Sequence, residues 1–306
     1  MRSSRRAALA AGAWVLAGLL VAIVVVPAGG ASAPEKRRPN LCLDPDERRQ
    51  HRLKCPDLRM RPPYDLDREK IGGKPVLRAA NSIDSVGRGP AELRGKRTGA
   101  KTMDAVQRIK QRGGGTSKFD NGAKLYFKAI PGQYRYWKFR DAARFSLWRL
   151  DGDGDRIRRV EVGPKQIYCL RDLKRTHKRM DGSPRRRVYP SCSQDPNKRR
   201  VTLGTSVGWS DIYPYTYHQN WIELDSIPAR GCYSFVHVAD PRNGIYELNE
   251  KNNAASTVVY LTRSGRWKPH RCRGVRDRAL PKRQSTDDSQ VHGARGGGGG
   301  GPYRGG

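Results

Sequence analysis

The chain has 306 residues, with 61 lysines and arginines against 29 aspartates and glutamates, and a formal net charge of +32. This length allows one or two domains with a real core. The charge disfavours lysine-rich partners and favours polyanions such as acidic wall polymers, anionic lipid heads or nucleic acid. An arginine-rich composition that simply keeps the protein soluble is the alternative explanation.

The first 33 residues predict an export signal rather than part of the fold. Three arginines within the first six residues are followed by an apolar run over 7–26 and by Ala-Ser-Ala at 31–33, a typical cleavage site. The run is also long enough to span a bilayer as an uncleaved anchor. In both cases we expect the remaining chain to be secreted or associated with the cell envelope.

Six cysteines in an exported chain predict disulfide bonds. Pairing nearest neighbours in the sequence would join Cys42 to Cys55, Cys169 to Cys192 and Cys232 to Cys272, which is one of many sets that six cysteines allow. No CxxC pair lies beside histidines, so we expect no zinc site.

The pattern of apolar residues predicts an all-β fold over 76–281. Residues 34–75 are expected to form an extended, disulfide-tied lead-in, and the Gly-rich residues 282–306 are expected to be disordered. Apolar residues at period two or in short runs predict strands at 77–84, 124–130, 143–150, 157–162, 221–227, 232–239 and 256–262. Many short strands with Gly and Pro turns are typical of an antiparallel β-sandwich.

The segment DGDGD at 151–155 separates two of these strands. We expect a hairpin turn there. Its three aspartates also resemble the start of a calcium loop, but arginine occupies the sixth position, where such a loop needs glycine.

Two segments carry a resemblance to a known family. Lys165 lies two residues after a glycine in GPKQIYCLRD (163–172), and Tyr213 lies eight residues before Trp221 in SDIYPYTYHQNWIELD (210–225). Both segments resemble the lysyl oxidase catalytic domain, in which such a lysine and tyrosine form the lysine tyrosylquinone cofactor. The resemblance implies that Lys165 and Tyr213 are the cofactor precursors.

Three further segments, in the same order along the chain, are similar to that family. They are VGRGPAEL (86–93), MDAVQRIK (103–110) and the expected hairpin at 229–261. Together they imply an antiparallel β-sandwich that resembles the lysyl oxidase catalytic domain, with long loops and disulfides.

The copper site of that family is absent from its usual place. The family has a His-x-His-x-His run, and the matching segment here reads QYRYWKF, with Tyr134, Tyr136 and Lys138 at the three ligand positions. A tyrosine hydroxyl, with a pKa of about 10, is a poor copper ligand at neutral pH, and a lysine ammonium repels a cation. A site assembled from His218, His237 and another donor is the alternative.

The densest basic patch lies between Cys169 and Arg200. Its candidate polyanion-binding residues are Arg175, Arg179, Arg185, Arg186, Arg187, Arg199 and Arg200. Arginine forks match the paired oxygens of phosphate and carboxylate groups. A solvated loop held open by its own charge is the alternative interpretation.

Two functions follow from these patterns. The first is a secreted lysyl oxidase-like protein without catalytic copper or cofactor, which binds acidic envelope or matrix polymers and in which Lys165 and Tyr213 are framework residues. The second is a copper-dependent amine oxidase that converts primary amines, or the lysines of partner proteins, to aldehydes through the quinone. We do not expect nucleic acid to be the partner of an exported protein.

Overall fold

The computed structural model describes residues 39–129, 135–225, 227–264 and 266–280. The predicted export signal, Tyr134 and the Gly-rich tail lie outside these residues. Within the described ranges, no helix is both long enough and apolar enough to cross a membrane.

The predicted all-β class is confirmed, because strands account for 49% of the structure and helix for 3%, and every strand pairing is antiparallel. The larger sheet has eleven strands in the order β12-β5-β6-β7-β8-β15-β16-β17, with β1, β9 and β10 paired at its sides. These strands are β1 (Leu53–Lys54), β5 (Ala91–Arg97), β6 (Thr102–Gln111), β7 (Thr116–Lys128), β8 (Tyr136–Leu150), β9 (Arg156–Val162), β10 (Gln166–Tyr168), β12 (Arg200–Thr205), β15 (Gly231–Ala239), β16 (Ala254–Leu261) and β17 (Trp267–Lys268).

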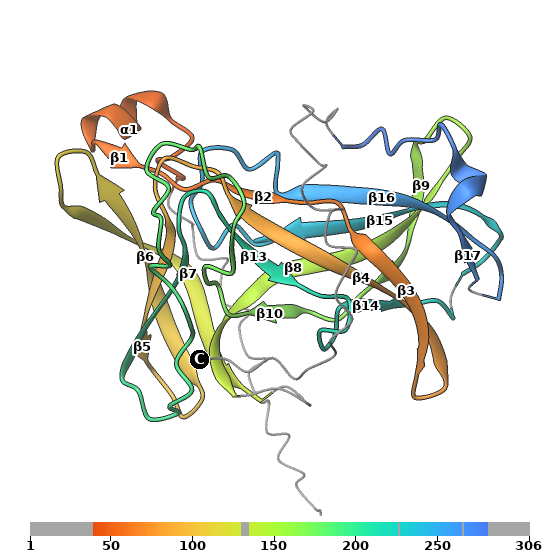
Figure 1. Ribbon diagram of the computed structural model, residues 1–306, viewed down its shortest axis with the longest axis horizontal. Coiled ribbons are helices and arrows are strands. Elements are labelled where there is room, and N and C mark those ends of the chain that lie inside the picture. The colour runs from red at the N-terminus through yellow and green to blue at the C-terminus, as the bar shows by residue number, and fades with distance from the viewer. Residues whose placement is uncertain (1–38, 130–134, 226, 265, 281–306) are drawn as a thin grey trace, which may run out of the picture. The chain divides into compact units, whose positions relative to one another are not determined.

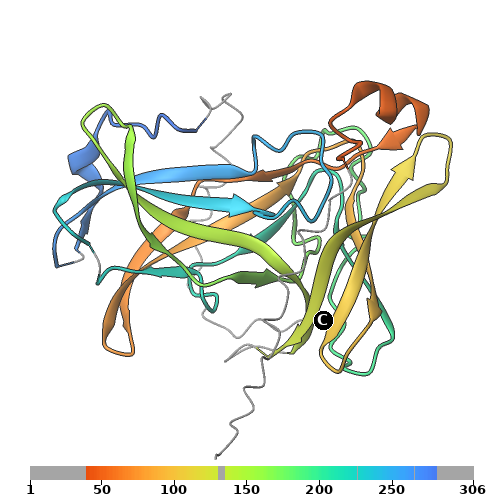
Figure 2. The same cartoon turned by 180° about the vertical axis from the view of Figure 1, so that it is seen from behind.

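The smaller sheet has six strands and is organised around one long strand, β4. Its strands are β2 (Leu58–Met60), β3 (Tyr64–Ile71), β4 (Lys74–Ser85), β11 (Lys174–Arg175), β13 (Trp209–Tyr213) and β14 (Trp221–Glu223). β4 and β13 lie in front of β8 and β15 in Figure 1, and β8 and β15 lie in front when the molecule is seen from behind in Figure 2. The two sheets therefore form two layers.

The hydrophobic core lies between these layers. It contains Leu77 and Ile83 of β4 together with Phe145 of β8 and Phe235 of β15, all at most 1% exposed. Strand alternation explains how the sequence supplies this core. In β6, for example, Met103 and every second residue after it up to Ile109 are buried, while the residues between them are exposed or half-buried.

β8 is the strand that connects the two halves of the larger sheet. Its residues 136–139 pair with β7, and its residues 143–149 pair with β15. Asp141 lies between the two pairings with a φ of +57°, a left-handed conformation that few residues other than glycine adopt. This irregularity marks the point at which β8 passes from one partner to the other.

The segment expected as an extended lead-in is part of the folded unit. Asp44 accepts hydrogen bonds from the backbone N–H groups of Asp46 and Glu47, and these bonds cap a short helix, α1 (Pro45–Gln50). β1 pairs with β6, and both β2 and β3 pair with β4. The segment therefore supplies strands to both sheets.

Most of the expected strands are present. β4, β9, β15 and β16 cover four of them, β7 and β8 begin earlier than expected, and β14 ends earlier. β3, β5, β12 and β13 were not predicted from the sequence. The short helical turn η1 (Pro269–Cys272) leads into the last described residues.

The nearest-neighbour disulfide pairing is confirmed, with bonds Cys42–Cys55, Cys169–Cys192 and Cys232–Cys272. The hairpin turn at 151–155 is also confirmed, because Asp151 Oδ1 accepts hydrogen bonds from the backbone N–H groups of Asp153 and Asp155. Gly154 is required in this turn, since its φ is +88° and a Cβ there would lie 1.8 Å from the carbonyl oxygen of Arg276.

Candidate functional site

Tyr213 lies at the centre of a buried cluster of tyrosines. Its ring stacks on Tyr168 of β10 at a centroid distance of 3.7 Å and meets the ring of Tyr217 edge-on at 4.7 Å. Its hydroxyl donates to Asp211 Oδ2 at 2.8 Å. Burial, followed by the negative charge of Asp211, raises the pKa of Tyr213 well above its usual value. The phenol is therefore neutral and fixed in orientation.

Polar side chains of neighbouring segments hold this cluster in place. The hydroxyl of Tyr168 accepts a hydrogen bond from Asn81 Nδ2 at 2.9 Å and donates to Asn220 Oδ1 at 2.8 Å. Asn81 belongs to β4, which pairs with the strand of Tyr213. The tyrosine cluster thus joins both sheets through hydrogen bonds as well as ring contacts.

Lys165, the predicted partner of Tyr213, lies outside this cluster. Its side chain is exposed, whereas Gln166 and Tyr168, the inward-facing residues of β10, are at most 1% exposed. Because successive side chains of a strand point to opposite faces, Lys165 is directed away from the face that carries Tyr168. Among the described residues, the structure brings no hydrogen bond or ion pair between Lys165 and the tyrosine cluster.

A different lysine, Lys138 of β8, enters the cluster. It is 1% exposed, its Nζ lies 3.4 Å from the hydroxyl of Tyr217, and it lies 4.5 Å from the ring centroid of Tyr136. Burial, followed by the positive charge of Arg171, lowers the pKa of Lys138 to about 8, while the negative charge of Asp211 opposes the change. The third of the expected copper-ligand positions is therefore occupied by a buried amine.

Asp211 is the acidic member of the same cluster and is fully buried. Burial raises its pKa to about 8, although the hydrogen bond from Tyr213 and the charges of Arg171 and Lys138 act in the opposite direction. Its Oδ1 has no hydrogen-bond partner within the described part of the chain. Asp211 and Lys138 attract each other electrostatically, yet the described residues form no salt bridge between them.

The residues at the expected copper position do not fit copper(II). Copper(II) prefers imidazole donors, whereas Tyr136 offers a phenol and Lys138 an ammonium group. His237 is buried against Phe145, with ring centroids 3.7 Å apart, and burial lowers its pKa well below the usual value. His218 is half-buried in the loop that follows β13. Across the described ranges, no group of three or more His, Cys, Asp or Glu side chains could hold a metal ion.

The second candidate region is the loop closed by the Cys169–Cys192 disulfide, together with residues 198–200 that follow it. We call these residues the basic loop. Asp172, which is fully buried, fixes its return half, because Oδ2 accepts hydrogen bonds from the backbone N–H groups of Val188 at 2.8 Å and Tyr189 at 3.1 Å. Its Oδ1 accepts from the N–H of Ser206 at 2.7 Å. The loop is therefore anchored to Ser206, the residue that follows β12, in addition to being closed by its disulfide.

The outward half of the basic loop is anchored as well. The Trp209 indole donates to the carbonyl of Pro184 at 3.0 Å, and His177 Nε2 lies 2.9 Å from Asp84 Oδ2. Although burial alone would raise it, the pKa of Asp84 falls to about 2 because His177 and Ser210 hydrogen-bond to it and Arg61 is close. The ionised carboxylate of Asp84 therefore stabilises the outward half of the basic loop through its contact with His177.

One of the predicted polyanion-binding residues serves the loop itself. Arg175 is half-buried and donates hydrogen bonds to the hydroxyl and the carbonyl of Ser183, both at 2.9 Å, and to the carbonyl of Lys178 at 3.0 Å. These three bonds come from Nε and Nη2 of its guanidinium group. We therefore assign Arg175 to loop structure, although its residue type suggested a contact with a ligand.

The remaining predicted arginines are displayed to solvent. Arg179, Arg185, Arg186, Arg187, Arg199 and Arg200 are all exposed. Arg187 also donates one hydrogen bond to the carbonyl of Leu173 at 3.2 Å. None of the six forms a salt bridge with another described residue. Their positive charges are thus available to a ligand.

The basic character continues from the loop onto the edge of the larger sheet. Arg200 of β12 pairs directly with Lys96 of β5, and Thr202 pairs with Arg94. All four of these residues are exposed. Like charges directly opposite each other across two strands destabilise a sheet slightly, so an anion bound between them would relieve the repulsion.

Comparison of the chain with protein-family models found no match, and a search of curated proteins found no similar sequence. The resemblance to lysyl oxidases therefore depends on the motifs quoted above.

Sequence reasoning missed the buried ionisable residues of both regions. Lys138 appeared as a position where a ligand was lost, although it is a core residue beneath the tyrosines. Asp172 was not singled out in the sequence, although it is the main anchor of the basic loop. One signal was present in the sequence: both residues lie within apolar or aromatic runs, YWKF and CLRDL, in which a charged side chain needs a buried partner.

Proposed function

We propose that this protein is a binding module for acidic polymers and that the basic loop is its recognition surface. One observation carries the proposal. A loop whose backbone is fixed by a disulfide and by buried Asp172 displays six arginines that have no acidic partner among the described residues.

The basic loop is already ordered before it binds a ligand, and this makes it a better binding surface than a flexible basic tail. Binding costs free energy when loops and side chains become ordered, and a loop that is already ordered avoids part of this cost. Arginine guanidinium groups pair with carboxylate and phosphate oxygens through parallel hydrogen bonds, which adds geometry to charge. The three consecutive residues Arg185, Arg186 and Arg187 supply the highest local density of such groups.

We also propose that the fold is that of the lysyl oxidase catalytic domain and that the protein is exported. The antiparallel all-β architecture supports the fold, and the position of Tyr213 on β13, next to the Tyr-Cys-Leu segment with which it stacks, agrees with the motif order. Three disulfide bonds support an oxidising environment.

The amine oxidase alternative receives less support from the arrangement of these residues. It would require imidazole donors at a position where Lys138 is buried, and a lysine beside Tyr213 where Lys165 is exposed. Tyr213 and Lys165 are better explained as framework residues, of which Tyr213 joins the two sheets.

The direct test is a binding titration with polymers of different chemistry. Polygalacturonate and polyphosphate should bind, and neutral dextran should not. Affinity should fall steeply as salt rises, because bound cations are released from the polymer when arginines replace them. If dextran bound as well as the acidic polymers, or if affinity did not depend on salt, the proposal would be wrong.

A further inference from the structure

The outer face of β12 and β5 carries three basic side chains beside the basic loop. Antiparallel pairing places Thr202 opposite Arg94 and Arg200 opposite Lys96. Because every second side chain of a strand lies on the same face, these four side chains point the same way, and all four are exposed. The three basic ones form no salt bridge with another described residue.

The ring of Tyr189, from the return half of the basic loop, lies on this same face. Its hydroxyl donates to Glu92 Oε2 at 2.6 Å, and Glu92 pairs with Gly204 in the row next to Thr202 and Arg94. A Cβ at Gly204 would lie 3.0 Å from two carbons of the ring, so the ring covers a position that only glycine leaves open. One side of the ring therefore rests on the sheet, and Tyr189 as a whole is half-buried.

The acidic groups near this face do not cancel its charge. Glu92 forms a salt bridge of 2.9 Å with Arg108. Asp104, the only other acidic residue of β5, β6 and β12, forms one of 2.7 Å with Lys124. Asp172 adds one negative charge beneath the loop, where the N–H of Tyr189 binds it. Three basic side chains against this one carboxylate leave an excess of two positive charges, without counting the arginines of the basic loop.

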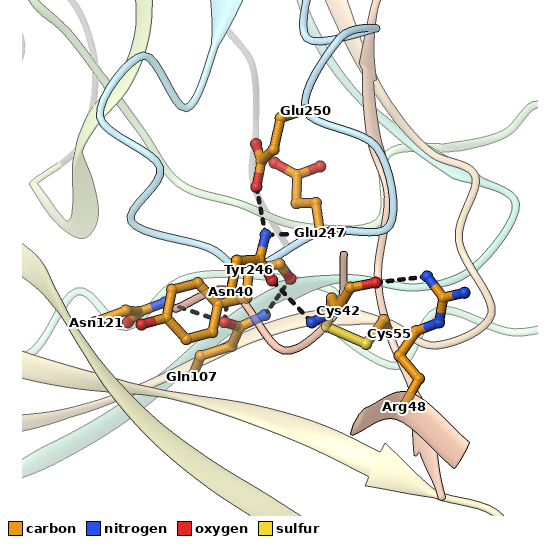
Figure 3. The surroundings of a disulfide bond; sticks show 9 residues. All are labelled: Asn40, Cys42, Arg48, Cys55, Gln107, Asn121, Tyr246, Glu247 and Glu250. Atoms are coloured by element: carbon orange, nitrogen blue, oxygen red, sulfur yellow. Dashed lines mark hydrogen bonds between the residues drawn. A yellow bond between two sulfur atoms is a disulfide. The ribbon is translucent and has the colours of Figure 1, made fainter. Parts of the chain in front are cut away.

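The strands that carry this face are held from the core side. Gln107 of β6, the neighbour of β5, is fully buried, and its Nε2 donates to the carbonyl of Tyr246 at 2.9 Å while its Oε1 accepts from the N–H of the same residue at 2.8 Å. Asn121 of β7 donates to the same Oε1 at 3.0 Å. Figure 3 shows Gln107 between Asn121 and Tyr246. The outer side chains are thus displayed by strands that are already ordered, which avoids part of the cost of binding.

A half-buried aromatic ring beside unpaired cations suits a sugar ring that carries a carboxylate. The C–H groups of a pyranose give it an apolar side, and the negative face of an aromatic ring attracts such partly positive hydrogens. Tyrosine offers this contact at a low cost in conformational entropy. The row of Gly204 and the row of Arg200 are four residues apart, which is about 13 Å along a strand. A chain stacked on Tyr189 therefore has its next units beside the basic side chains.

We infer that the outer face of β12 and β5 is a subsite for a sugar-acid chain, in which Tyr189 stacks on one sugar ring while Arg94, Lys96 and Arg200 bind the carboxylates of its neighbours. The inference rests on the proposed function, since it names sugar acids as the class of acidic polymer that the basic loop binds. An acidic peptide or a chain of phosphates meets the same charges but presents no sugar ring to Tyr189.

Fluorescence anisotropy with labelled polygalacturonate and with labelled polyglutamate of equal length tests the role of the ring, because both polymers carry carboxylates and only the first has sugar rings. Tyr189→Leu should lose about fivefold in affinity for polygalacturonate and should bind polyglutamate within about twofold of the parent protein. Tyr189→Phe, which keeps the ring and lacks the hydroxyl, should bind polygalacturonate within about twofold of the parent protein. A ring that only supported the loop would weaken both polymers alike.

The double variant Arg94→Ser with Lys96→Ser tests the charges, and both side chains are exposed, so the fold should remain intact. Its matched control is Arg230→Ser with Lys251→Ser, which removes one exposed arginine and one exposed lysine from the connections before and after β15. We expect the first double variant to lose about tenfold in affinity for polygalacturonate and the control to lose less than about twofold.

The inference is overturned if the two double variants lose affinity equally, or if Tyr189→Leu weakens both polymers alike or neither. A parent protein that still binds acidic polymers in those cases leaves the proposed function standing. A parent protein that binds neither polymer overturns the proposed function and the inference together.

Discussion

Replacing Asp172 with asparagine separates loop order from net charge, because it changes the anchor of the basic loop without touching an arginine. The two carboxylate oxygens of Asp172 accept hydrogen bonds from three backbone N–H groups and from the Ser206 hydroxyl. An asparagine has one oxygen, so its NH₂ group would face a backbone N–H that it cannot satisfy. Losing a charge-assisted hydrogen bond and burying an unmatched donor should cost about 3 to 5 kcal/mol of unfolding free energy.

The matched control for this variant is Asp181→Asn in the same loop. Asp181 is exposed, so its replacement makes the same change in net charge while leaving the anchor intact, and stability should change by less than about 0.5 kcal/mol. Urea unfolding of both variants measures the stability difference.

Polymer binding by the two folded variants then tests the function. Both gain one unit of positive charge, which by itself should strengthen binding to polygalacturonate. We expect Asp181→Asn to bind as tightly as the parent protein or more tightly, and Asp172→Asn to bind several-fold more weakly, because its loop must be ordered on binding. Fluorescence anisotropy with labelled polymer measures both. Equal affinities for the two variants would refute the argument that a pre-ordered loop is the recognition surface.

The other predictions concern the tyrosine cluster. Lys138→Met should be as stable as the parent protein or up to about 2 kcal/mol more stable at pH 7, because it removes a poorly paired buried amine. Because the pKa of Lys138 is lowered in the folded protein, the unfolded chain binds more protons than the folded protein above pH 8. The free energy of unfolding of the parent protein should therefore rise from pH 8 to about 10.5. Urea unfolding of Lys138→Met should not show this rise. The raised pKa of Asp211 has the opposite sign, so it makes the parent protein lose stability as the pH rises from about 4 to 8. Asp211→Asn should have a shallower slope over this range, although Glu250, whose pKa is raised to about 7, still contributes to it. An unchanged slope would contradict the assignment. Protein expressed with copper should hold less than one copper per chain and show no quinone absorbance, and tightly bound copper with peroxide release from an alkylamine would contradict this.

The fold class was predictable because alternation and turn residues are local signals. The 151–155 turn and the strands on both sides of it follow from sequence pattern, and the disulfides join the cysteines that are nearest in the sequence. β5 and β12 were missed because Gly95 and Gly204, residues that strands disfavour, occupy buried positions within them, and because their pairing with each other and of β5 with β6 is not local in the sequence.

The site was predicted less completely because burial is a property of the whole fold. The arginines of the basic loop were identified from composition, and most are exposed as expected. Three findings depend on which strands face one another in the fold. Arg175 supports the loop, Lys138 is in the core and Lys165 is at the surface. Such relations join residues distant in sequence, and no local pattern contains them.

The most direct measurement compares two triple variants with identical loss of charge. One replaces Arg185, Arg186 and Arg187 with serine, and the other replaces the dispersed, exposed residues Arg112, Arg158 and Arg273 with serine. Both sets should change stability by roughly half a kcal/mol or less, since these side chains are not in the core. Polygalacturonate affinity is then measured as a function of salt. We predict that the loop variant loses at least tenfold in affinity and that its salt dependence falls by about three released ions, while the dispersed variant loses little. Equal losses from both variants would contradict the account, because net charge alone would then attract the polymer.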